Sequence, residues 1–517
     1  MRRSWIISAV VISATSIACT ALLGDFNTSN GVPEPGAEGG PNGIDSGMCN
    51  DTQKTCNGAC VSKTDPNAGC ATAVCTPCAA ATNAAPACKA GGCAFTCNDG
   101  FSDCDGNPAN GCEGKTSSDV LNCGTCGDPC GAANTTNVAT CTAGKCVFMC
   151  KMNFAHCGPT NATGCETDLD NDKLNCGACG HSCLGGVCKV GKCQPVQIAS
   201  TSQPSGLAVD KTHVYFAAPS LNRIDRVQRD GTCMPAMPCP QAFAGSDAGD
   251  PQTNLAFFRG PSAIVSDGMD VYWTAAAGVV KRSAALPPGA FKSIAPAVTT
   301  NPGYLALGGG KVWWTTGFAT ADPAPHLRNV APDGSNLTTF AFYPAPYTQF
   351  MGRGGVATDA TSIYWAAEKG GNVYRAAFTD PPCTEGFGAA VPCKGFGNAT
   401  NPYAVAVDDT YVYWADPTGG TIKRATKIGG SPVYIATNQD NPYSIAVLDG
   451  FVYWGNGNIN GPTSKTIRRT PSNAALCDGL ACEKVADVSA PDSIIAADDG
   501  IYWVDNIVAG GVFRLAK

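Results

Sequence analysis

Charged residues of either sign are scarce in this chain of 517 residues. They make up 15% of it, with 34 Lys and Arg against 41 Asp and Glu and a net charge of −7. A mildly acidic protein with so few cations has no field that attracts a phosphate backbone, so we expect no nucleic-acid partner. Gly and Pro, by contrast, number 61 and 36, and this composition favours turns and β-structure over helices.

Common catalytic motifs are also missing. The chain has four His, and none of them is paired with a nucleophile. It contains no Gly-x-Ser-x-Gly elbow, no His-Glu-x-x-His and no phosphate-binding glycine loop. These absences exclude the usual hydrolases, metalloproteases and nucleotide-binding proteins, and we expect no cofactor.

The apolar run at the N-terminus is too short to span a membrane. It extends from Trp5 to Ala18 and follows Arg2 and Arg3. A short apolar run behind positive charges is typical of a secretory signal. Residues 1–18 are therefore predicted to form a signal peptide.

A lipidation signal follows this run. The stretch from Ser16 to Cys19, SIAC, resembles the lipobox of bacterial lipoproteins, in which the Cys is acylated and becomes the mature N-terminus. The Leu usual in that family is replaced by Ser16. We expect Cys19 to carry a lipid; the alternative is an ordinary signal peptide cleaved near Ala18 or Ala21.

The segment after Cys19 contains little apolar surface. Because burial within it cannot offset the entropy cost of ordering the chain, residues 19–48 are predicted to form a lipid-anchored flexible tether. The membrane is then a partner only through the N-terminal lipid. We expect a lipoprotein of the outer membrane or cell surface; the alternative is a periplasmic or secreted protein.

Cysteine is concentrated in one part of the chain. Of the 31 cysteines, 24 lie between Cys49 and Cys193 and six lie beyond. Such density requires an oxidising compartment, in agreement with export. Because this stretch contains little Leu, Ile, Val or Phe, cross-links must hold it folded, with up to twelve disulfides. The spacing does not determine which cysteines pair.

A tandem repeat runs through this region. The eight cysteines from Cys88 to Cys130 recur 53 residues later, and NGCEGKTSSDVLNCGTCGDPC corresponds to TGCETDLDNDKLNCGACGHSC. The region therefore divides into a degenerate copy at 49–87 and two full copies at 88–140 and 141–193. It resembles the NCGxCGxxC repeats of bacterial surface lipoproteins of unknown role.

Two patterns in the repeats resemble metal sites. The Cys-x-x-Cys pairs at 123–126 and 176–179 have the spacing of zinc knuckles and redox sites, but in an exported chain they favour structural disulfides. The acidic run at 168–173 alternates carboxylates as a calcium loop does. It lacks the Gly and Glu that an EF-hand requires, so it predicts a polar turn.

A different repeat begins after residue 193. Seven strand cores end in an aromatic residue, 40 to 57 residues apart, and each is followed by an apolar segment that carries Arg. Pro stands twelve residues before the aromatic in six copies, and Arg353 takes its place in the fourth. The aromatic residues are Phe216, Trp273, Trp314, Trp365, Trp414, Trp454 and Trp503.

Each copy is predicted to form four short antiparallel strands, which match the blade of a β-propeller. The last copy stops after its third strand, and PVQIAS before the first copy supplies the missing fourth, so the two ends would close one blade. Residues 194–517 are therefore predicted to form an all-β, seven-bladed propeller, with six blades as the alternative. The disulfide repeats before it should have little regular secondary structure.

The copies resemble the YWTD repeats of the LDL-receptor propellers and, more loosely, the NHL and TolB-like propellers. VYWTA and VYWAD come nearest to the YWTD sequence. The resemblance implies the architecture and no binding residue.

Residues that recur in every copy are more typical of packing than of binding. We expect the Tyr-Trp pairs to pack between neighbouring blades and the seven Arg to bond to the next blade. Four recurring Asp end a first strand and are expected to cap turns rather than to bind metal. They are Asp210, Asp267, Asp359 and Asp408.

Departures from the repeat are better candidates for function. Propeller geometry places the position beside the recurring Pro at the mouth of the central channel, and the copies differ most there. The candidate ligand-binding residues are Tyr304, Arg353, Tyr403, Tyr443 and Asp492. Three local pairs are expected to close hairpin loops by disulfides: Cys233 with Cys239, Cys383 with Cys393, and Cys477 with Cys482.

Two functions suit this architecture, besides a purely structural coat component. The first is a non-catalytic binding or scaffolding propeller on a disulfide-stabilised stalk, with an unknown extracellular protein or glycan as partner. The second is a propeller hydrolase, lactonase or lyase with calcium or another divalent cation in the central channel. Several acidic, His or Asn side chains at the channel mouth would favour the enzyme, whereas an apolar or Tyr-rich mouth would favour binding.

Overall fold

In the computed structural model the chain is all-β and forms two compact units. Met1–Ala80 with Pro86–Thr96 make up the first, and Ala81–Ala85 with Cys97–Lys517 make up the second. Cys19, Cys233, Cys239 and Arg353 lie outside the described residues. The structure describes residues 49–71, 75–159, 164–232, 240–245, 260–275, 278–283, 291–296, 302–316, 325–342, 354–367, 371–384, 393–397, 399–457 and 465–517.

The cysteine-rich region consists of short two-stranded hairpins. Four of them turn through a residue followed by Gly, at 57–58, 90–91, 143–144 and 190–191, and both turn residues have positive φ. This turn matches the twist of a two-residue hairpin, and Gly adopts its conformation readily. The elements are β1 (Gln53–Cys56), β2 (Ala59–Ser62), the 3-10 helix η1 (Pro66–Ala68), β3 (Ala84–Lys89), β4 (Gly92–Cys97), β5 (Thr140–Thr142), β6 (Lys145–Val147), β7 (Phe154–Ala155), β8 (Thr167–Asp168), β9 (Cys188–Lys189) and β10 (Lys192–Cys193).

Twelve disulfides join all the cysteines of this region in a regular pattern. In each full copy the third Cys bonds to the fifth and the fourth to the seventh, whereas the sixth and eighth bond to the next hairpin along the chain. These bonds are Cys97–Cys112, Cys104–Cys126, Cys123–Cys141 and Cys130–Cys146, and then Cys150–Cys165, Cys157–Cys179, Cys176–Cys188 and Cys183–Cys193. The degenerate copy contributes Cys49–Cys60, Cys56–Cys75, Cys70–Cys88 and Cys78–Cys93. The degenerate copy and the first full copy are thus each covalently tied to the copy that follows.

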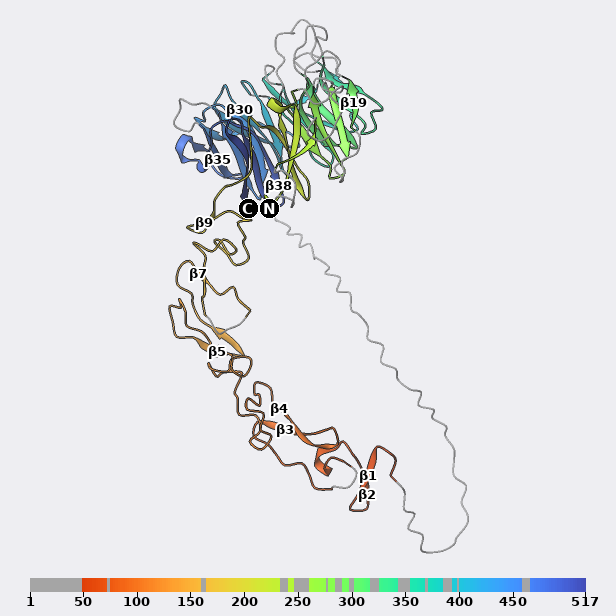
Figure 1. The fold of residues 1–517 in the computed structure, drawn as a ribbon, viewed down its shortest axis with the longest axis vertical. Helices are drawn as coiled ribbons and strands as arrows, with labels where there is room; N and C mark the ends of the chain where they lie inside the picture. The colour runs from red at the N-terminus through yellow and green to blue at the C-terminus, as the bar shows by residue number, and fades with distance from the viewer. Residues whose placement is uncertain are drawn as a thin grey trace, which may run out of the picture. The chain divides into compact units, whose positions relative to one another are not determined.

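The propeller has seven antiparallel sheets, blades 1 to 7, arranged side by side in Figure 1. Blade 1 consists of β12 (Ser205–Val209), β13 (His213–Ala218), the 3-10 helix η3 (Pro219–Leu221), β14 (Arg223–Gln228) and β15 (Gln241–Ala244). Blade 2 consists of β16 (Ile264–Ser266), β17 (Asp270–Ala275), β18 (Gly278–Ser283) and β19 (Lys292–Pro296). Blade 3 consists of β20 (Pro302–Gly308), β21 (Lys311–Thr316), β22 (Pro325–Val330) and β23 (Thr338–Phe342).

The remaining blades follow the same plan. Blade 4 consists of β24 (Val356–Thr358), β25 (Ser362–Ala367), β26 (Asn372–Ala377) and β28 (Lys394–Gly395). Blade 5 consists of β29 (Ala404–Val407), β30 (Tyr411–Asp416), β31 (Thr421–Thr426) and β32 (Val433–Thr437). Blade 6 consists of β33 (Pro442–Leu448), β34 (Phe451–Asn456), β35 (Thr466–Pro471) and β37 (Glu483–Asp487), with the 3-10 helix η7 (Gly479–Ala481). Blade 7 is β38 (Pro491–Ala497), β39 (Gly500–Asp505), β40 (Gly510–Ala516) and β11 (Val196–Thr201).

Blade 7 closes the ring with strands from the two ends of the propeller sequence. β11 pairs antiparallel with β40, so PVQIAS provides the fourth strand of the last copy. The inner strands contact one another in an unbroken circle, from β12 through β16, β20, β24, β29 and β33 to β38 and back to β12. The propeller therefore has seven blades, as the repeats predict.

The core lies between the blades. Successive residues of a strand point to opposite faces of its sheet, so the Tyr and Trp of each pair contact different neighbouring blades. Tyr215 of blade 1 packs with Trp273 of blade 2, and Tyr364 of blade 4 packs with Trp414 of blade 5. The tryptophans at this repeated position have at most 4% of their surface exposed. They are packing residues, as expected.

Two disulfide-closed loops extend neighbouring blades. β27 (Cys383–Thr384) follows β26 and pairs in parallel with β23 of the preceding blade, and β36 (Cys477–Asp478) pairs in the same way with β32. Cys383 is bonded to Cys393 and Cys477 to Cys482. Each loop therefore covers part of the hydrogen-bonding edge of the preceding blade.

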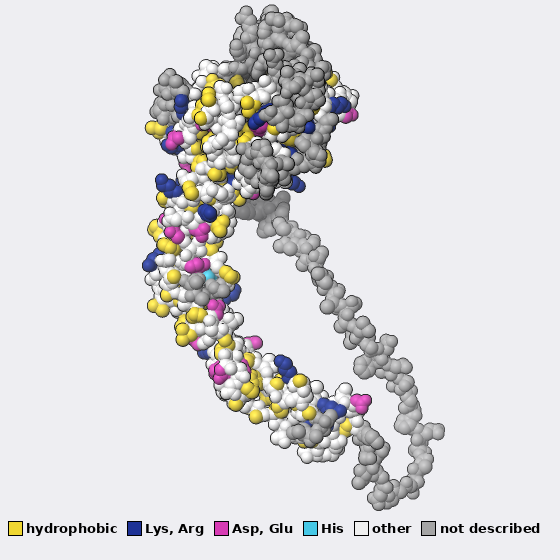
Figure 2. All heavy atoms as spheres, viewed as in Figure 1, with side chains coloured by type: hydrophobic (Ala, Val, Ile, Leu, Met, Phe, Trp, Pro, Cys, Tyr) yellow, Lys and Arg dark blue, Asp and Glu magenta, His cyan; other side chains and the backbone are white. Residues whose placement is uncertain are grey.

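The charged side chains are dispersed on the face shown in Figure 2. Lys and Arg are interspersed with Asp and Glu there, with no large area of one sign.

Candidate functional site

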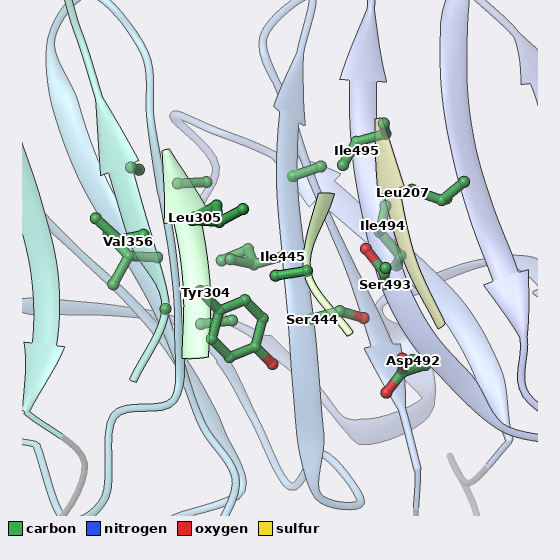
Figure 3. Close-up of a pocket in the computed structure, with 18 of the residues that line it drawn as sticks. Leu207, Tyr304, Leu305, Val356, Ser444, Ile445, Asp492, Ser493, Ile494 and Ile495 are labelled. Atoms are coloured by element: carbon green, nitrogen blue, oxygen red, sulfur yellow. The ribbon is translucent and has the colours of Figure 1, made fainter. Parts of the chain in front are cut away.

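The seven inner strands surround a central cavity of about 610 Å³. Nine residues before the recurring aromatic, every blade contributes an aliphatic side chain to its lining, part of which Figure 3 shows. These side chains are Leu207, Ile264, Leu305, Val356, Val405, Ile445 and Ile494. The sequence alone does not distinguish this ring, because a constant aliphatic position in a strand ordinarily indicates packing.

Three tyrosines gather on one side of this cavity. Tyr304 of blade 3 contacts Tyr403 of blade 5 edge to face, with ring centroids 5.7 Å apart, and Tyr403 contacts Tyr443 of blade 6 at 5.3 Å. Blade 4 has Gly354 and Gly355 at the corresponding positions, and the absence of side chains there lets the rings of Tyr304 and Tyr403 come into contact. All three rings are half-buried and line the cavity. We call them the tyrosine cluster.

Asp492 of blade 7 lines the same cavity. Its side chain is open to the channel, but the surrounding blades keep most bulk water away, so desolvation raises the pKa of its carboxyl group. The backbone N–H of Gly206 donates a hydrogen bond to it and works against that shift. Among the described residues no Lys, Arg or His forms an ion pair with Asp492.

Ser444 adds an unsatisfied hydroxyl to the lining. Its side chain is 6% exposed, and its Oγ has no hydrogen-bond partner among the described residues. Figure 3 shows Ser444, Tyr304 and Asp492 toward the same end of the channel. A buried hydroxyl without a partner is costly, but because this Oγ is buried from solvent it is not open to a ligand in the cavity.

Four of the five predicted ligand-binding residues therefore line one cavity: Tyr304, Tyr403, Tyr443 and Asp492. The fifth, Arg353, belongs to the residues that the structure does not describe. Ser444 was not predicted, because a single Ser in a strand carries no signal until the burial of its neighbours is known.

The described lining holds no metal-binding constellation. Asp492 is its only carboxylate, and it includes no Glu, His or Cys. Elsewhere in the described chain, Asp103, Asp105 and Glu113 lie close together. Glu113 accepts hydrogen bonds from two backbone N–H groups there, and the next copy has His156 and Gly158 in place of the two Asp. We therefore interpret these three carboxylates as part of a turn of the repeat and not as a metal site.

The recurring Asp residues occupy turns. In blade 5, Asp408 Oδ1 accepts hydrogen bonds from the backbone N–H groups of Thr410 and Tyr411, both at 2.7 Å, and Oδ2 accepts one from the Tyr413 hydroxyl at 2.6 Å. Asp359 does the same for Tyr364 of blade 4. Burial, together with the Asp359 carboxylate, raises the pKa of Tyr364 to about 12.

The recurring Arg residues bond to backbone and side chains of the sheets. Arg282 of blade 2 donates to the Phe243 carbonyl of blade 1 at 2.8 Å, and Arg375 of blade 4 donates to the Lys427 carbonyl of blade 5 at 3.0 Å. Arg469 instead pairs with Glu483 in its own blade at 2.8 Å. These contacts are structural, and none of the recurring Arg lines the cavity in the described chain.

Comparisons with known proteins give similarity to solved propellers. No family model matches the chain, and no curated protein matches it. A streptogramin B lyase structure is 14% identical with a TM-score of 0.45, over 62% of this chain and 96% of that one. A catalytically inactive virginiamycin B lyase from Staphylococcus aureus, solved with quinupristin, is 16% identical with a TM-score of 0.43, over 63% of this chain and 99% of that one. A nidogen–laminin complex is 15% identical with a TM-score of 0.33, over 50% of this chain and 89% of that one.

At these identities the similarity does not extend to a ligand or a reaction. The strand topology of the chain itself establishes its architecture. The protein is thus an all-β chain in which disulfide-linked cysteine repeats precede a seven-bladed β-propeller.

Proposed function

We propose that this protein is exported, is anchored through a lipid on Cys19, and uses its propeller as a non-catalytic binding module carried by the disulfide repeats. The observation that carries the proposal is the central cavity, with its aliphatic wall, its tyrosine cluster and one carboxylate. Cavities of roughly 300 to 1,000 Å³ with apolar walls and a few polar groups are typical ligand sites.

The cysteine-rich repeats suit export and display. Their cysteines are all paired in disulfides, and such density persists only in oxidising compartments. In the described part of the chain, no helix is long and apolar enough to cross a bilayer. The membrane attachment that we propose is the lipid on Cys19.

The binding proposal is tested on the full oxidised chain by metal analysis and by a screen of extracellular glycans and proteins. We expect saturable binding of one ligand without a stoichiometric metal. Tyr403→Ala should weaken that binding, because it removes the central ring of the tyrosine cluster. Tyr434→Ala, on the outer strand β32, is the matched control. A stoichiometric divalent cation together with turnover would favour the propeller hydrolase, lactonase or lyase instead.

The lipid anchor is tested by Cys19→Ser. This variant should lose the fatty acyl groups that mass spectrometry detects on the mature N-terminus, and it should leave the membrane fraction. An unmodified N-terminus cleaved near Ala21 in the native protein would contradict the proposal and would leave a periplasmic or secreted protein.

A further inference from the structure

We propose that the central cavity binds a small organic cation, an ammonium group on an apolar body, between the tyrosine cluster and Asp492. This inference rests on the proposed binding function and names the chemistry of its ligand. It follows from three properties of the described lining: its charge, its aromatic rings and its aliphatic wall.

In the described part of the lining, one side chain is acidic and none is basic. Among the described residues that line the cavity, Asp492 is the only Asp, Glu, Lys, Arg or His, and the only other titratable groups are the three tyrosines. A carboxylate in a partly desolvated site is stabilised by an opposite charge, and the described structure supplies none. A cationic ligand would provide that charge, whereas an anion would be repelled.

The tyrosine cluster favours the same ligand. The electron-rich face of a Tyr ring attracts a cation within about 6 Å of its centroid, most strongly where water is excluded. The two edge-to-face contacts hold Tyr304, Tyr403 and Tyr443 in fixed orientations, so little side-chain entropy is lost when a ligand binds. Several rings near one carboxylate are the usual means of recognising alkylated ammonium groups.

The aliphatic wall decides what kind of cation fits. Calcium requires six or more oxygen ligands, whereas the described lining offers one carboxylate, the Asn506 amide and scattered hydroxyls such as those of Ser262 and Thr358 in a largely aliphatic wall. An ammonium group that carries alkyl or aryl substituents instead buries those substituents against Leu305, Val405 and Ile445.

The test compares three probes of one shape. Choline is a cation, 3,3-dimethylbutan-1-ol is its neutral carbon isostere, and 3,3-dimethylbutanoate is an anion of similar outline. Binding to the full oxidised protein is measured by isothermal titration calorimetry. We expect choline to bind at least about tenfold more tightly than the neutral isostere, because only choline offers a charge to Asp492 and the rings. The anion should not bind.

Substitutions test which residues contribute to choline binding. Asp492→Asn keeps the volume of the side chain and should weaken choline binding about tenfold while leaving the neutral isostere unchanged. Tyr403→Phe keeps the π-face and should retain choline binding, whereas Tyr403→Leu should reduce it. Asp487→Asn on the outer strand β37 is the matched control. Near-UV circular dichroism establishes that each variant is folded.

Each outcome decides the proposal. Equal affinity for choline and its neutral isostere would overturn the cation inference and leave an apolar binding site, consistent with the proposed function. No saturable binding of choline would also overturn it, and the glycan and protein screen would then decide the binding function separately. Loss of choline binding in Asp487→Asn would show that the cation binds elsewhere.

Discussion

At the scale of single residues, the turn aspartates show how one polar side chain supports two layers of structure. Asp408 accepts two backbone hydrogen bonds, which form its turn, and a third from the buried Tyr413, which lies between blades. Its neighbour Asp409 is exposed and makes none of these bonds. Adjacent carboxylates of the same type therefore differ entirely in what they stabilise.

Asp408→Ala should lower the free energy of unfolding by about 2 kcal/mol, because it leaves three donors without their acceptor, one of them in the core. Asp409→Ala should change it by less than about 0.5 kcal/mol. Urea denaturation of both variants measures the difference. Equal effects would contradict the structural role assigned to the recurring Asp.

Asp492 predicts a pH dependence of ligand binding. Desolvation raises the pKa of its carboxyl above the usual value of an exposed Asp, so it gains its proton at a higher pH on acidification. Choline has no group that titrates in this range. Its affinity should therefore be full above the raised pKa and fall as the pH drops through it, when measured by calorimetry. Asp492→Asn should give a flat profile, and a native profile without this fall would contradict the assignment.

At the scale of elements, a cation three residues after the recurring Arg joins neighbouring blades. Lys427 of blade 5 pairs with Asp359 of blade 4 at 2.9 Å, and both side chains are less than 20% exposed. Lys517 of blade 7 pairs with Asp449 of blade 6 at 3.4 Å, but these side chains are 46% and 57% exposed. The same connection thus exists in a buried and an exposed form.

A double-mutant cycle of Lys427→Met and Asp359→Asn should give a coupling energy of about 1 to 2 kcal/mol in urea denaturation. The Lys517–Asp449 pair should give almost none, because water and salt screen it. Coupling of equal size in the two pairs would show that burial does not control the contribution.

The buried pair also has a pH signature. Burial opposes ionisation of Asp359, but Lys427 and the N–H groups of its turn hold the pKa of this carboxyl well below its ordinary value. Its stabilising contribution is therefore full above the unfolded pKa of about 3.9 and is lost as the pH falls through the lower folded value. Asp359→Asn should remove this part of the acid sensitivity.

At the scale of the whole molecule, the propeller depends on β11 to close its ring. A chain that begins at residue 194 keeps β11 and should unfold in one cooperative transition. A chain that begins at residue 202 lacks β11, leaves the edge of β40 (Gly510–Ala516) unpaired and should be several kcal/mol less stable. Thermal denaturation compares the two. Equal midpoints would mean that the seventh blade does not need its fourth strand.

Much of this architecture could be predicted from the order of residues alone. The repeated Tyr-Trp pairs, their spacing and the incomplete last copy indicated the strands, the seven blades and the closure by PVQIAS, because the packing of each blade on the next imposes the same pattern on every copy. The count of cysteines likewise predicted twelve disulfides in the repeats. These features are periodic, and periodicity is visible in one dimension.

Tertiary structure alone decided which groups meet. The pairing of cysteines across successive copies, the approach of Tyr304 to Tyr403 past two glycines of blade 4, and the unpaired hydroxyl of Ser444 all depend on distances between residues far apart in the chain. The sequence could mark Tyr304, Tyr403, Tyr443 and Asp492 as exceptions to a repeat. Only closure of the ring places them around one partly desolvated cavity, because a channel exists only when all seven inner strands are in place.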